Sequence, residues 1–239
     1  MHRWVGDLLE SWVRHHHLSL FRKAWRTLKE PPHFEDHRNF LNLWYLDGKK
    51  GWPLGRNPDF LMRGLFNRMV IKKGDTVLDV CCGDGFFDYL FYSPLANQID
   101  ALDFDVEALK LARHYHQYVN IRYYQSNCLT ESFPKNFYDV IIFDGAIAHF
   151  RKEEIDLLMN KFKGCLSAGG ILVGSEALER LEEKTWDHHQ IFPNAQDLEQ
   201  FLKSYFPYVS VKTLDPIGDR YQEAYFRCSV AQPKDDFYF

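Results

Sequence analysis

The chain has 239 residues, of which 46% are hydrophobic and 26% are charged, and its formal net charge is −4. This composition supports a substantial hydrophobic core, and the length suits one domain with an added terminal segment better than two full domains. The mild negative charge argues against a dedicated nucleic-acid-binding protein, which would present a basic face. No apolar run is long enough to cross a bilayer, and the N-terminus lacks the apolar region of a signal peptide.

The five cysteines favour a reducing compartment. Their number is odd, they form no C-x-x-C pair, and the adjacent Cys81 and Cys82 are poor disulfide partners. We therefore expect reduced thiols in a cytoplasmic protein, and the cysteine spacing gives no zinc signature.

Residues 1–70 differ from the rest of the chain in composition and in hydrophobic pattern. Apolar residues at helical spacing predict a first amphipathic helix, and the residues after it are basic. We interpret residues 1–70 as a helical N-terminal extension that packs on the main domain. A second interpretation is a helix that lies weakly on an anionic membrane surface, or on a partner protein.

Residues 71–239 alternate between strand and helix patterns. Strands are expected at 76–80, 98–104, 121–127, 138–145 and 171–177, with helices at 85–92, 105–118, 152–166 and 194–206. Asp105 is a good N-cap for the second of these helices. The segments 208–215 and 221–231 carry alternating β-type residues, as in an antiparallel hairpin. This order predicts an α/β fold, a doubly wound and mostly parallel sheet with the hairpin at its edge.

The loop Cys81–Gly85 follows the first strand, at the edge where such sheets bind ligands. It is a poor dinucleotide site, because Asp88 stands where the third glycine of G-x-G-x-x-G would be and would repel a diphosphate. A P-loop is excluded because no G-K-[ST] follows. A phosphate-free nucleoside fits better: Asp103 ends the second strand about 20 residues further on, the distance at which an acidic side chain reaches ribose hydroxyls. Asp79 would suit a cationic group of the ligand.

These segments together resemble the class I S-adenosylmethionine-dependent methyltransferases. The resemblance rests on "VLDVCCGDGFF", "ALDFDVEALKLAR", "QSNC", "FYDVIIFDGAIAHF" and "LSAGGILVGSE", which occur in the family's order between Gly74 and Glu176. It implies a Rossmann-like, seven-stranded sheet in a methyltransferase domain at residues 71–239. Cys81 replaces the family's usual first glycine, which disfavours a positive φ at that position.

The resemblance also implies the cofactor, S-adenosylmethionine, and the residues that bind it. Asp103 would bind the ribose hydroxyls and Phe104 would lie against the adenine, whose edge Asn127 and the Cys128 amide would bind. The backbone of Cys81, Gly83 and Gly85 would approach the methionine part and the sugar. Asp79 and Asp144 would lie near the amino group. Helix capping for the acidic residues, and core packing for Phe104 and Cys81, are the structural alternatives.

Three histidines are candidates for a catalytic base, which a hydroxyl acceptor would need. His149 follows the fourth strand beside the expected methyl donor, and His188 and His189 follow the fifth strand, where the family often builds its acceptor pocket. For each, a hydrogen bond within its own loop is the alternative. A metal site at Asp187, His188 and His189 is not expected, because adjacent residues seldom point at one ion.

The acceptor is expected to be a small polar molecule. Aromatic residues near Trp44 and Trp52, with the region 178–193, suit a lid over a sugar or another hydroxylated metabolite. The fourth strand is not followed by an N-P-P-Y-type motif, which favours O-methylation over N-methylation of a nucleobase or amide. Two alternatives remain: a catalytically silent protein of this fold that binds a partner, and an aminopropyl transferase. The sequence gives no indication of the oligomeric state.

Overall fold

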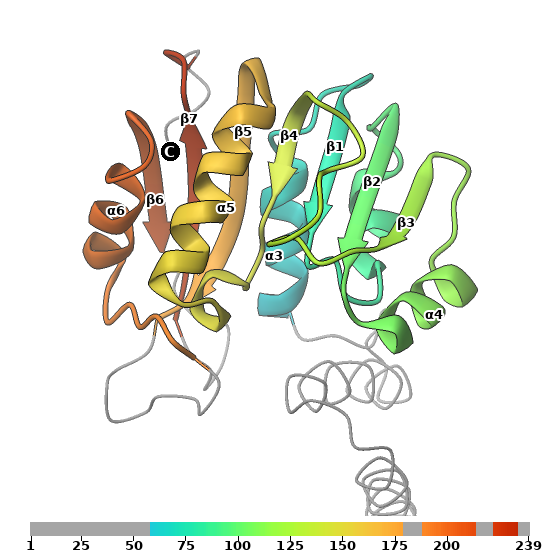
Figure 1. Ribbon diagram of the computed structural model, residues 1–239, viewed down its shortest axis with the longest axis horizontal. Coiled ribbons are helices and arrows are strands. Elements are labelled where there is room, and N and C mark those ends of the chain that lie inside the picture. The colour runs from blue at the N-terminus through green and yellow to red at the C-terminus, as the bar shows by residue number, and fades with distance from the viewer. Residues whose placement is uncertain (1–57, 179–187, 214–221, 234–239) are drawn as a thin grey trace, which may run out of the picture. The chain divides into compact units, whose positions relative to one another are not determined.

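A computed structural model describes residues 58–178, 188–213 and 222–233 of the chain (Figure 1). The expected first amphipathic helix, with its membrane or partner interpretation, lies outside these residues, as do Trp44 and Trp52. Within the described ranges, no helix combines the length and apolar character needed to cross a membrane.

The core of the fold is a seven-stranded sheet with the order β3-β2-β1-β4-β5-β7-β6. Strands β1 to β5 are parallel, and β7 runs antiparallel to both β5 and β6. This arrangement confirms the predicted doubly wound sheet and its C-terminal hairpin. The strands are β1 Thr76–Val80, β2 Gln98–Asp103, β3 Ile121–Gln125, β4 Tyr138–Ile142, β5 Leu166–Ala177, β6 Tyr208–Thr213 and β7 Glu223–Ser229.

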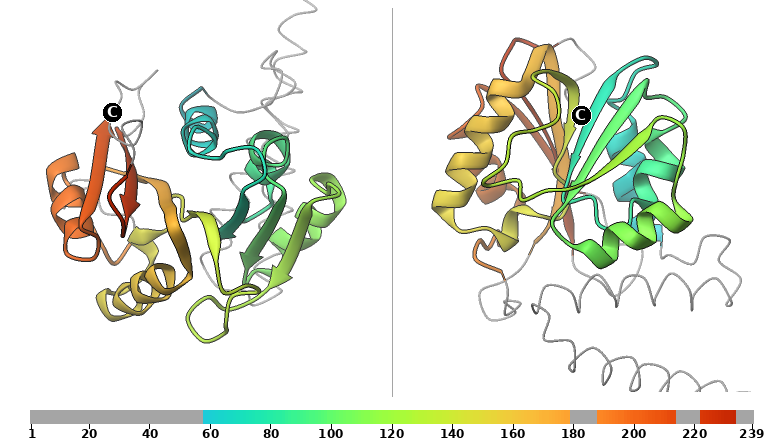
Figure 2. Two further views of the ribbon diagram at one scale, coloured as in Figure 1. Left: turned by 90° about the horizontal axis from the view of Figure 1, so that it is seen from above. Right: turned by 45° about the vertical axis from the view of Figure 1, so that its right-hand side comes forward.

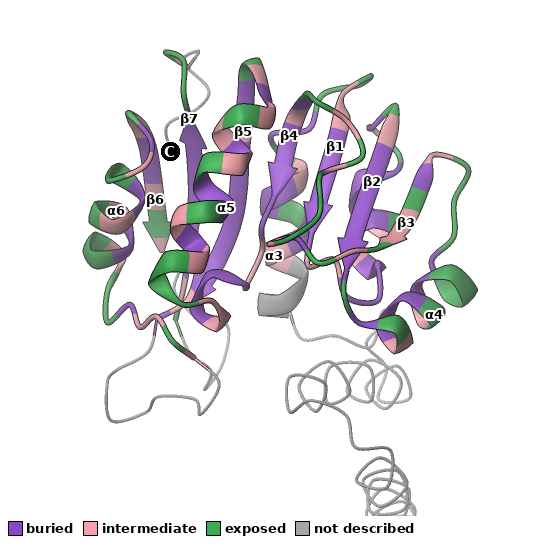
Figure 3. Ribbon diagram, in the orientation of Figure 1, coloured by how far each residue is buried: buried purple, intermediate pink, exposed green. Residues whose placement is uncertain are grey.

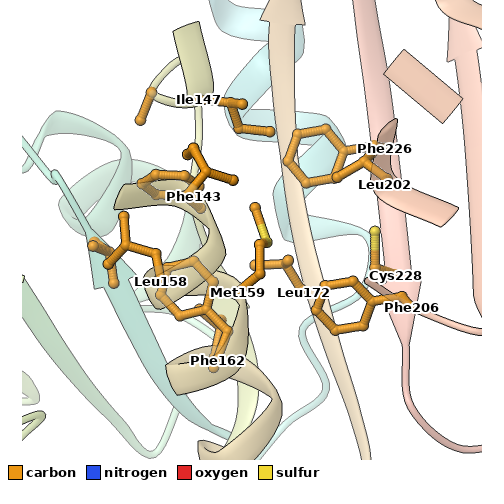
Figure 4. Close-up of a cluster of buried hydrophobic side chains, with 14 of the residues drawn as sticks. Phe143, Ile147, Leu158, Met159, Phe162, Leu172, Leu202, Phe206, Phe226 and Cys228 are labelled. Atoms are coloured by element: carbon orange, nitrogen blue, oxygen red, sulfur yellow. The ribbon is translucent and has the colours of Figure 1, made fainter. Parts of the chain in front are cut away.

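Successive residues of each central strand point to opposite faces of the sheet, and both faces are covered. On one face Leu78 packs with residues of α5 (Lys152–Cys165) and α6 (Ala195–Lys203), including Phe162 and Leu202 (Figure 4). On the other face Val77 packs with Phe66 of α3 (Pro58–Arg68). Helices α3 and α5 therefore lie on opposite sides of the sheet (Figure 2).

The helix α4 (Val106–Tyr115) begins where the sequence predicts. The Asp105 side chain accepts hydrogen bonds from the backbone N–H groups of Glu107 and Ala108, as an N-cap should. The central strands β1, β2 and β4 are largely buried, whereas the edge strand β3 and the outer faces of α4 and α5 are partly exposed (Figure 3).

Two elements differ from the expected pattern. The helix after the loop Cys81–Gly85 is short and ends in a π-type turn, η2 (Asp88–Tyr92). The Ser93 N–H donates a hydrogen bond to the Asp88 carbonyl at 2.8 Å and closes this turn. Pro94, which lacks an N–H, follows at once and disfavours a longer helix. The strand β5 begins at Leu166 rather than at residue 171, and its pairing with β4 shifts register across the glycine pair 169–170.

Candidate functional site

The candidate site lies at the carboxyl ends of the parallel strands. The predicted residues follow four strands that are neighbours in the sheet: Cys81 follows β1, Phe104 follows β2, Asn127 follows β3, and Asp144 follows β4. This is the edge toward which the arrows of β1 and β2 point in Figure 1. The fold therefore brings residues that are far apart in sequence to one side of the molecule, where open α/β sheets bind ligands.

The loop after β1 is a tight left-handed turn held to β2. Cys81, Gly83 and Gly85 all have positive φ values, of 65°, 57° and 67°. Cys81 thus adopts the conformation that the family's usual glycine would take freely, contrary to the disfavoured φ expected for a cysteine. The Cys82 N–H donates to the Leu102 carbonyl at 3.0 Å, which fixes the loop against the end of β2.

Asp103 is the residue that joins this loop to β2. It is buried, and its two carboxylate oxygens accept hydrogen bonds from the backbone N–H groups of Gly83 and Asp105, both at 2.8 Å. Each oxygen has a second lone pair, so these bonds leave capacity for two ligand hydroxyls. The observed contact with the loop and the predicted binding of the ribose hydroxyls are therefore compatible. Phe104 follows directly, with 53% of its surface exposed.

The turn after β3 brings Asn127 and Cys128 to the same edge. The Asn127 side-chain oxygen accepts the Leu129 N–H at 2.9 Å, so the predicted adenine-binding side chain also stabilises its own turn. The Cys128 thiol contacts the Cys81 thiol across the sheet edge. That contact, together with burial, raises the pKa of the Cys81 thiol well above its usual range.

Asp79 lies at the β1 end of the site, next to a carboxyl that the predicted set of site residues lacks. Asp79 is buried, and its side chain meets that of Asp88, which is fully buried in η2. Burial is the largest cause of the raised pKa values of both groups, and their proximity adds to the effect for Asp79. For Asp88 the pKa rises to about 8.

Asp144 lies beyond the end of β4 and is paired with a cation from α3. The Arg63 guanidinium donates to the Asp144 carboxylate through Nε at 3.0 Å and through a terminal nitrogen at 2.9 Å. The Ser175 hydroxyl donates to the other Asp144 oxygen at 2.8 Å, and Glu223 lies 3.9 Å from Arg63. Burial alone would lower the pKa of Arg63, but Asp144 and Glu223 outweigh it and hold the pKa above its ordinary value.

Glu176, at the end of β5, positions the turn that carries a candidate base. Its carboxylate accepts the Ile147 N–H at 2.6 Å and interacts with the backbone of Ala148, at the start of the 3-10 turn η3 (Ile147–His149). Burial raises the pKa of Glu176 to about 8, although the Ile147 bond and Arg63 oppose the shift.

The three predicted histidines come together at this turn. The rings of His149 and His188 lie 4.7 Å apart in an edge-to-face arrangement. The backbone N–H of His189 donates to the Ala148 carbonyl at 2.6 Å, which ties the segment after β5 to the end of η3. His149 and His188 are half-buried and His189 is exposed. Asp187 lies outside the described residues, and within them no group of three or more His, Cys, Asp or Glu side chains is arranged for a metal ion.

The donor set fits an adenosyl sulfonium. Carboxyl groups of Asp79, Asp103 and Asp144 suit a ligand that carries hydroxyls and positive charge. Asp84 and Asp88 are buried in and just after the loop, where they would oppose a diphosphate. The loop chemistry thus agrees with the exclusion of a dinucleotide.

Sequence reasoning missed Arg63, Asp88, Glu176 and Glu223 as site residues. Asp88 and Glu176 could have been identified from the sequence. Asp88 lies inside the aromatic run "FFDYLFY" and Glu176 at the end of the apolar run "ILVGSE", and acidic residues are unusual in such runs. No local sequence pattern distinguishes Arg63 or Glu223 as a site residue. Their partners lie far away in sequence and become neighbours only through the sheet order.

Comparison with known proteins gives a family match over the central part of the chain. Residues 77–170 match the family described as "Methyltransferase domain". These residues run from β1 into β5 and contain most of the site described above. No curated protein matches the sequence.

Many solved structures share the fold. The complex of DhpI with SAH is 18% identical, with a TM-score of 0.56, and the match covers 72% of this chain and 85% of that one. The N-methyltransferase NodS from Bradyrhizobium japonicum WM9 is 17% identical, with a TM-score of 0.58 and coverages of 76% and 100%. The [4+2]-cyclase SpnF is 14% identical, with a TM-score of 0.55 and coverages of 71% and 81%. At these identities the likeness concerns the fold.

Proposed function

Given that residues 77–170 form a class I S-adenosylmethionine-dependent methyltransferase domain, we propose that the protein methylates a hydroxyl oxygen of a small polar molecule such as a sugar. Its cofactor is S-adenosylmethionine, which supplies an electrophilic methyl group on a sulfonium. The protein must bind this donor, orient the acceptor for in-line attack and accept the acceptor's proton.

The residues around the first loop divide the work of binding. Asp103 is held in place by the Gly83 and Asp105 N–H groups and presents its remaining lone pairs to the ribose hydroxyls. Phe104 offers an exposed ring for the adenine. Asp79, on the buried side of the loop, offers a carboxyl to the ammonium of the methionine part.

The observation that supports O-methylation is the histidine cluster at the turn η3. A hydroxyl is a poor nucleophile until a base takes its proton, and the imidazole pKa near neutrality suits that task. His149 is carried on a turn whose backbone is fixed by Glu176, and its ring lies against that of His188. We assign His149 as the base and His188 as its neighbour that limits the ring's orientation.

The two alternatives are less well supported. Aminopropyl transfer would call for a strongly acidic pocket, and Asp144 is joined at this edge by Glu176 and Glu223. Arg63, however, binds Asp144 and lies beside Glu223, so part of this negative charge is neutralised. A catalytically silent protein of the same fold would bind the cofactor and methylate nothing, an outcome that the experiment below separates.

The test separates cofactor binding from transfer with two substitutions. S-adenosylhomocysteine is titrated by calorimetry into the wild type, Asp103→Ala and His149→Ala, and the same preparations are assayed for methyl transfer to a panel of hydroxylated small molecules. We expect Asp103→Ala to lose binding. His149→Ala should bind like the wild type but transfer methyl groups 10²- to 10⁴-fold more slowly, the typical contribution of a general base.

A control substitution, Glu107→Gln, changes a half-buried carboxylate of α4 that pairs with Lys110, and it should affect neither readout. Circular dichroism melts verify that each variant is folded. Wild-type protein that does not bind S-adenosylhomocysteine would contradict the proposal. Binding without transfer to any hydroxylated acceptor would favour the silent alternative, and full transfer by His149→Ala would remove His149 as the base.

A further inference from the structure

Asp88 is the buried polar group whose environment most needs an explanation. Asp88 is 0% exposed, and neither of its carboxyl oxygens accepts a hydrogen bond from the described residues. Buried carboxylates are normally bound by N–H or O–H donors, because an unpaired buried charge is costly. The polar side chain that Asp88 does meet is the carboxyl of Asp79.

Two carboxyl groups in contact can form a hydrogen bond only if one of them carries a proton. Two ionised carboxylates at this position would repel each other where little solvent can screen them. Full burial of Asp88 without a donor, beside the buried carboxyl of Asp79, therefore favours at least one retained proton in the ligand-free protein. The proton belongs to the pair rather than to either residue.

The groups that face this pair from neighbouring elements are acids as well. They come from the loop after β1, from the ends of β2 and β4, from β3 and from η2 itself, and they are Cys82, Asp84, Asp103, Asp144, Tyr123 and Tyr92. The two arginines of the packed helix α3 are engaged elsewhere: Arg63 binds Asp144, and Arg68 donates to the Phe91 carbonyl of η2. Burial and acidic neighbours together raise the pKa of Asp88 to about 8 and that of Asp79 well above its usual range.

Among the described residues, the neighbours of Asp79 are acidic, and the proposed function puts a cation beside it, the ammonium of the cofactor's methionine part. Resting on that proposed function, we propose that Asp79 and Asp88 form one proton-linked receptor, which gives up a proton to solvent when the cofactor's ammonium binds. One O–H bond breaks, the proton passes to buffer, and the negative charge left on the pair binds the ammonium. Asp88 acts as a positioning residue through Asp79.

The consequence is a cofactor affinity that rises with pH. If binding releases one proton, the association constant increases up to tenfold for each pH unit below the pair's titration. The rise ends once the free protein has already lost that proton. A ligand that lacks the ammonium should bind with no such dependence.

The decisive measurement counts protons released on binding. S-adenosylhomocysteine is titrated into the wild type at pH 6.5, where the ligand's amino group is protonated, in phosphate and in imidazole buffer. The buffers differ in ionisation enthalpy, so the difference between the binding enthalpies gives the number of protons released. We expect on the order of one proton. The matched ligand 5′-methylthioadenosine has no amino-acid part, and its binding should release none.

The matched variant is Asp88→Asn, which keeps the shape of the side chain and removes one titrating group. Asp79 then loses its acidic neighbour but stays buried, so we expect binding of S-adenosylhomocysteine to release fewer protons than in the wild type and to depend less on pH. A purely structural role for Asp88 would weaken both ligands equally and leave the proton count unchanged. Glu107→Gln serves as the control that retains the release.

Each result decides a different question. Wild-type binding without proton release, equal release with 5′-methylthioadenosine, or undiminished release in Asp88→Asn would each overturn the proton-linked receptor. Because the comparison of the two ligands uses the wild type alone, it decides the matter even if Asp88→Asn does not fold. Failure of the wild type to bind either ligand would overturn the proposed function, and this inference with it.

Discussion

At the scale of single residues, Cys81 is strained by its own backbone. Its φ of 65° is unfavourable for a residue with a Cβ, at a cost of about 1 kcal/mol. We predict that Cys81→Gly is more stable than Cys81→Ala by about 1 kcal/mol, because both lose the thiol and only alanine retains the strain. This order is the reverse of that found in a regular helix or strand. Urea denaturation of the two variants gives the difference directly.

The comparison with the wild type shows how much the thiol contributes. Cys81 packs against the hydrophobic cluster on the α5 side of the sheet and contacts Cys128, so its loss removes contacts as well as strain. Equal stabilities for the alanine and glycine variants would contradict the positive φ at this position.

Single site residues could be predicted where the groups that act together lie close to one another in the sequence. Asp103, two residues before the N-cap Asp105 and at the end of an apolar run, could be found from its spacing to the loop. The ion pair of Arg63 with Asp144 joins residues 81 positions apart, and no local pattern marks either partner for the other. The proximity of Asp79 and Asp88 could not be predicted either. The sequence around Asp79 does not indicate which side chain of the following helix lies beside it.

At the scale of elements, the turn after β4 depends on one glycine. Gly145 has a φ of 60°, and a Cβ at this position would lie 2.1 Å from a terminal nitrogen of Arg63. We predict that Gly145→Ala displaces Arg63 from Asp144 and destabilises the protein by about 1–3 kcal/mol, since strain and a broken buried pair act together. Urea denaturation measures the loss.

Gly164→Ala is the matched control for this substitution. Gly164 lies in α5, is exposed, and would place its new Cβ in open space. Alanine is favoured over glycine in helices by up to about 1 kcal/mol, so this variant should equal or exceed the wild type in stability. A Gly145→Ala variant as stable as Gly164→Ala would show that Arg63 and the turn adapt without cost.

Elements were predictable where hydrophobic period and capping agree. The alternation of strands with helices and the Asp105 N-cap sufficed to place β1 to β4 and α4. The start of β5 at Leu166 was missed because "SAGG" is typical of a helix end and a turn. In the structure these residues belong to β5, and the pairing with β4 shifts register there, next to Tyr138. The π-type turn at η2 arises from a tertiary setting, a buried carboxyl next to Asp79, that period alone does not encode.

At the scale of the whole molecule, the fold is better determined than the reaction. The order of β and α segments predicts this sheet, but solved structures with this fold include both an N-methyltransferase and a [4+2]-cyclase. The polar side chains at the end of β4 come from α3, β5 and β7 as well, and they meet only in three dimensions. Function must therefore be argued from that juxtaposition and tested on it.

The same buried acids predict how stability depends on pH. Asp88 and Glu176 have pKa values of about 8 in the folded protein, against about 4 in an unfolded chain. Between these values the folded protein holds protons that the unfolded chain has released, so each group favours folding at low pH and loses that contribution as the pH rises through 8. We expect the free energy of unfolding to fall by on the order of 3–6 kcal/mol between pH 5.5 and pH 8.5, a trend opposite to that of a protein stabilised by ionised carboxylates.

Urea denaturation at several pH values tests this expectation, with Asp88→Asn and Glu176→Gln as variants. Each substitution removes one titrating group, so each should flatten the decline. The double variant should flatten it most, because Asp88 lies in η2 and Glu176 in β5. Histidines titrate in the same range but are unchanged in the variants, so the difference between profiles isolates the two acids. A double variant that declines as steeply as the wild type would mean that Asp88 and Glu176 are already ionised in the folded protein at pH 5.5. Their buried positions would then be stabilised by ionic partners rather than by protons.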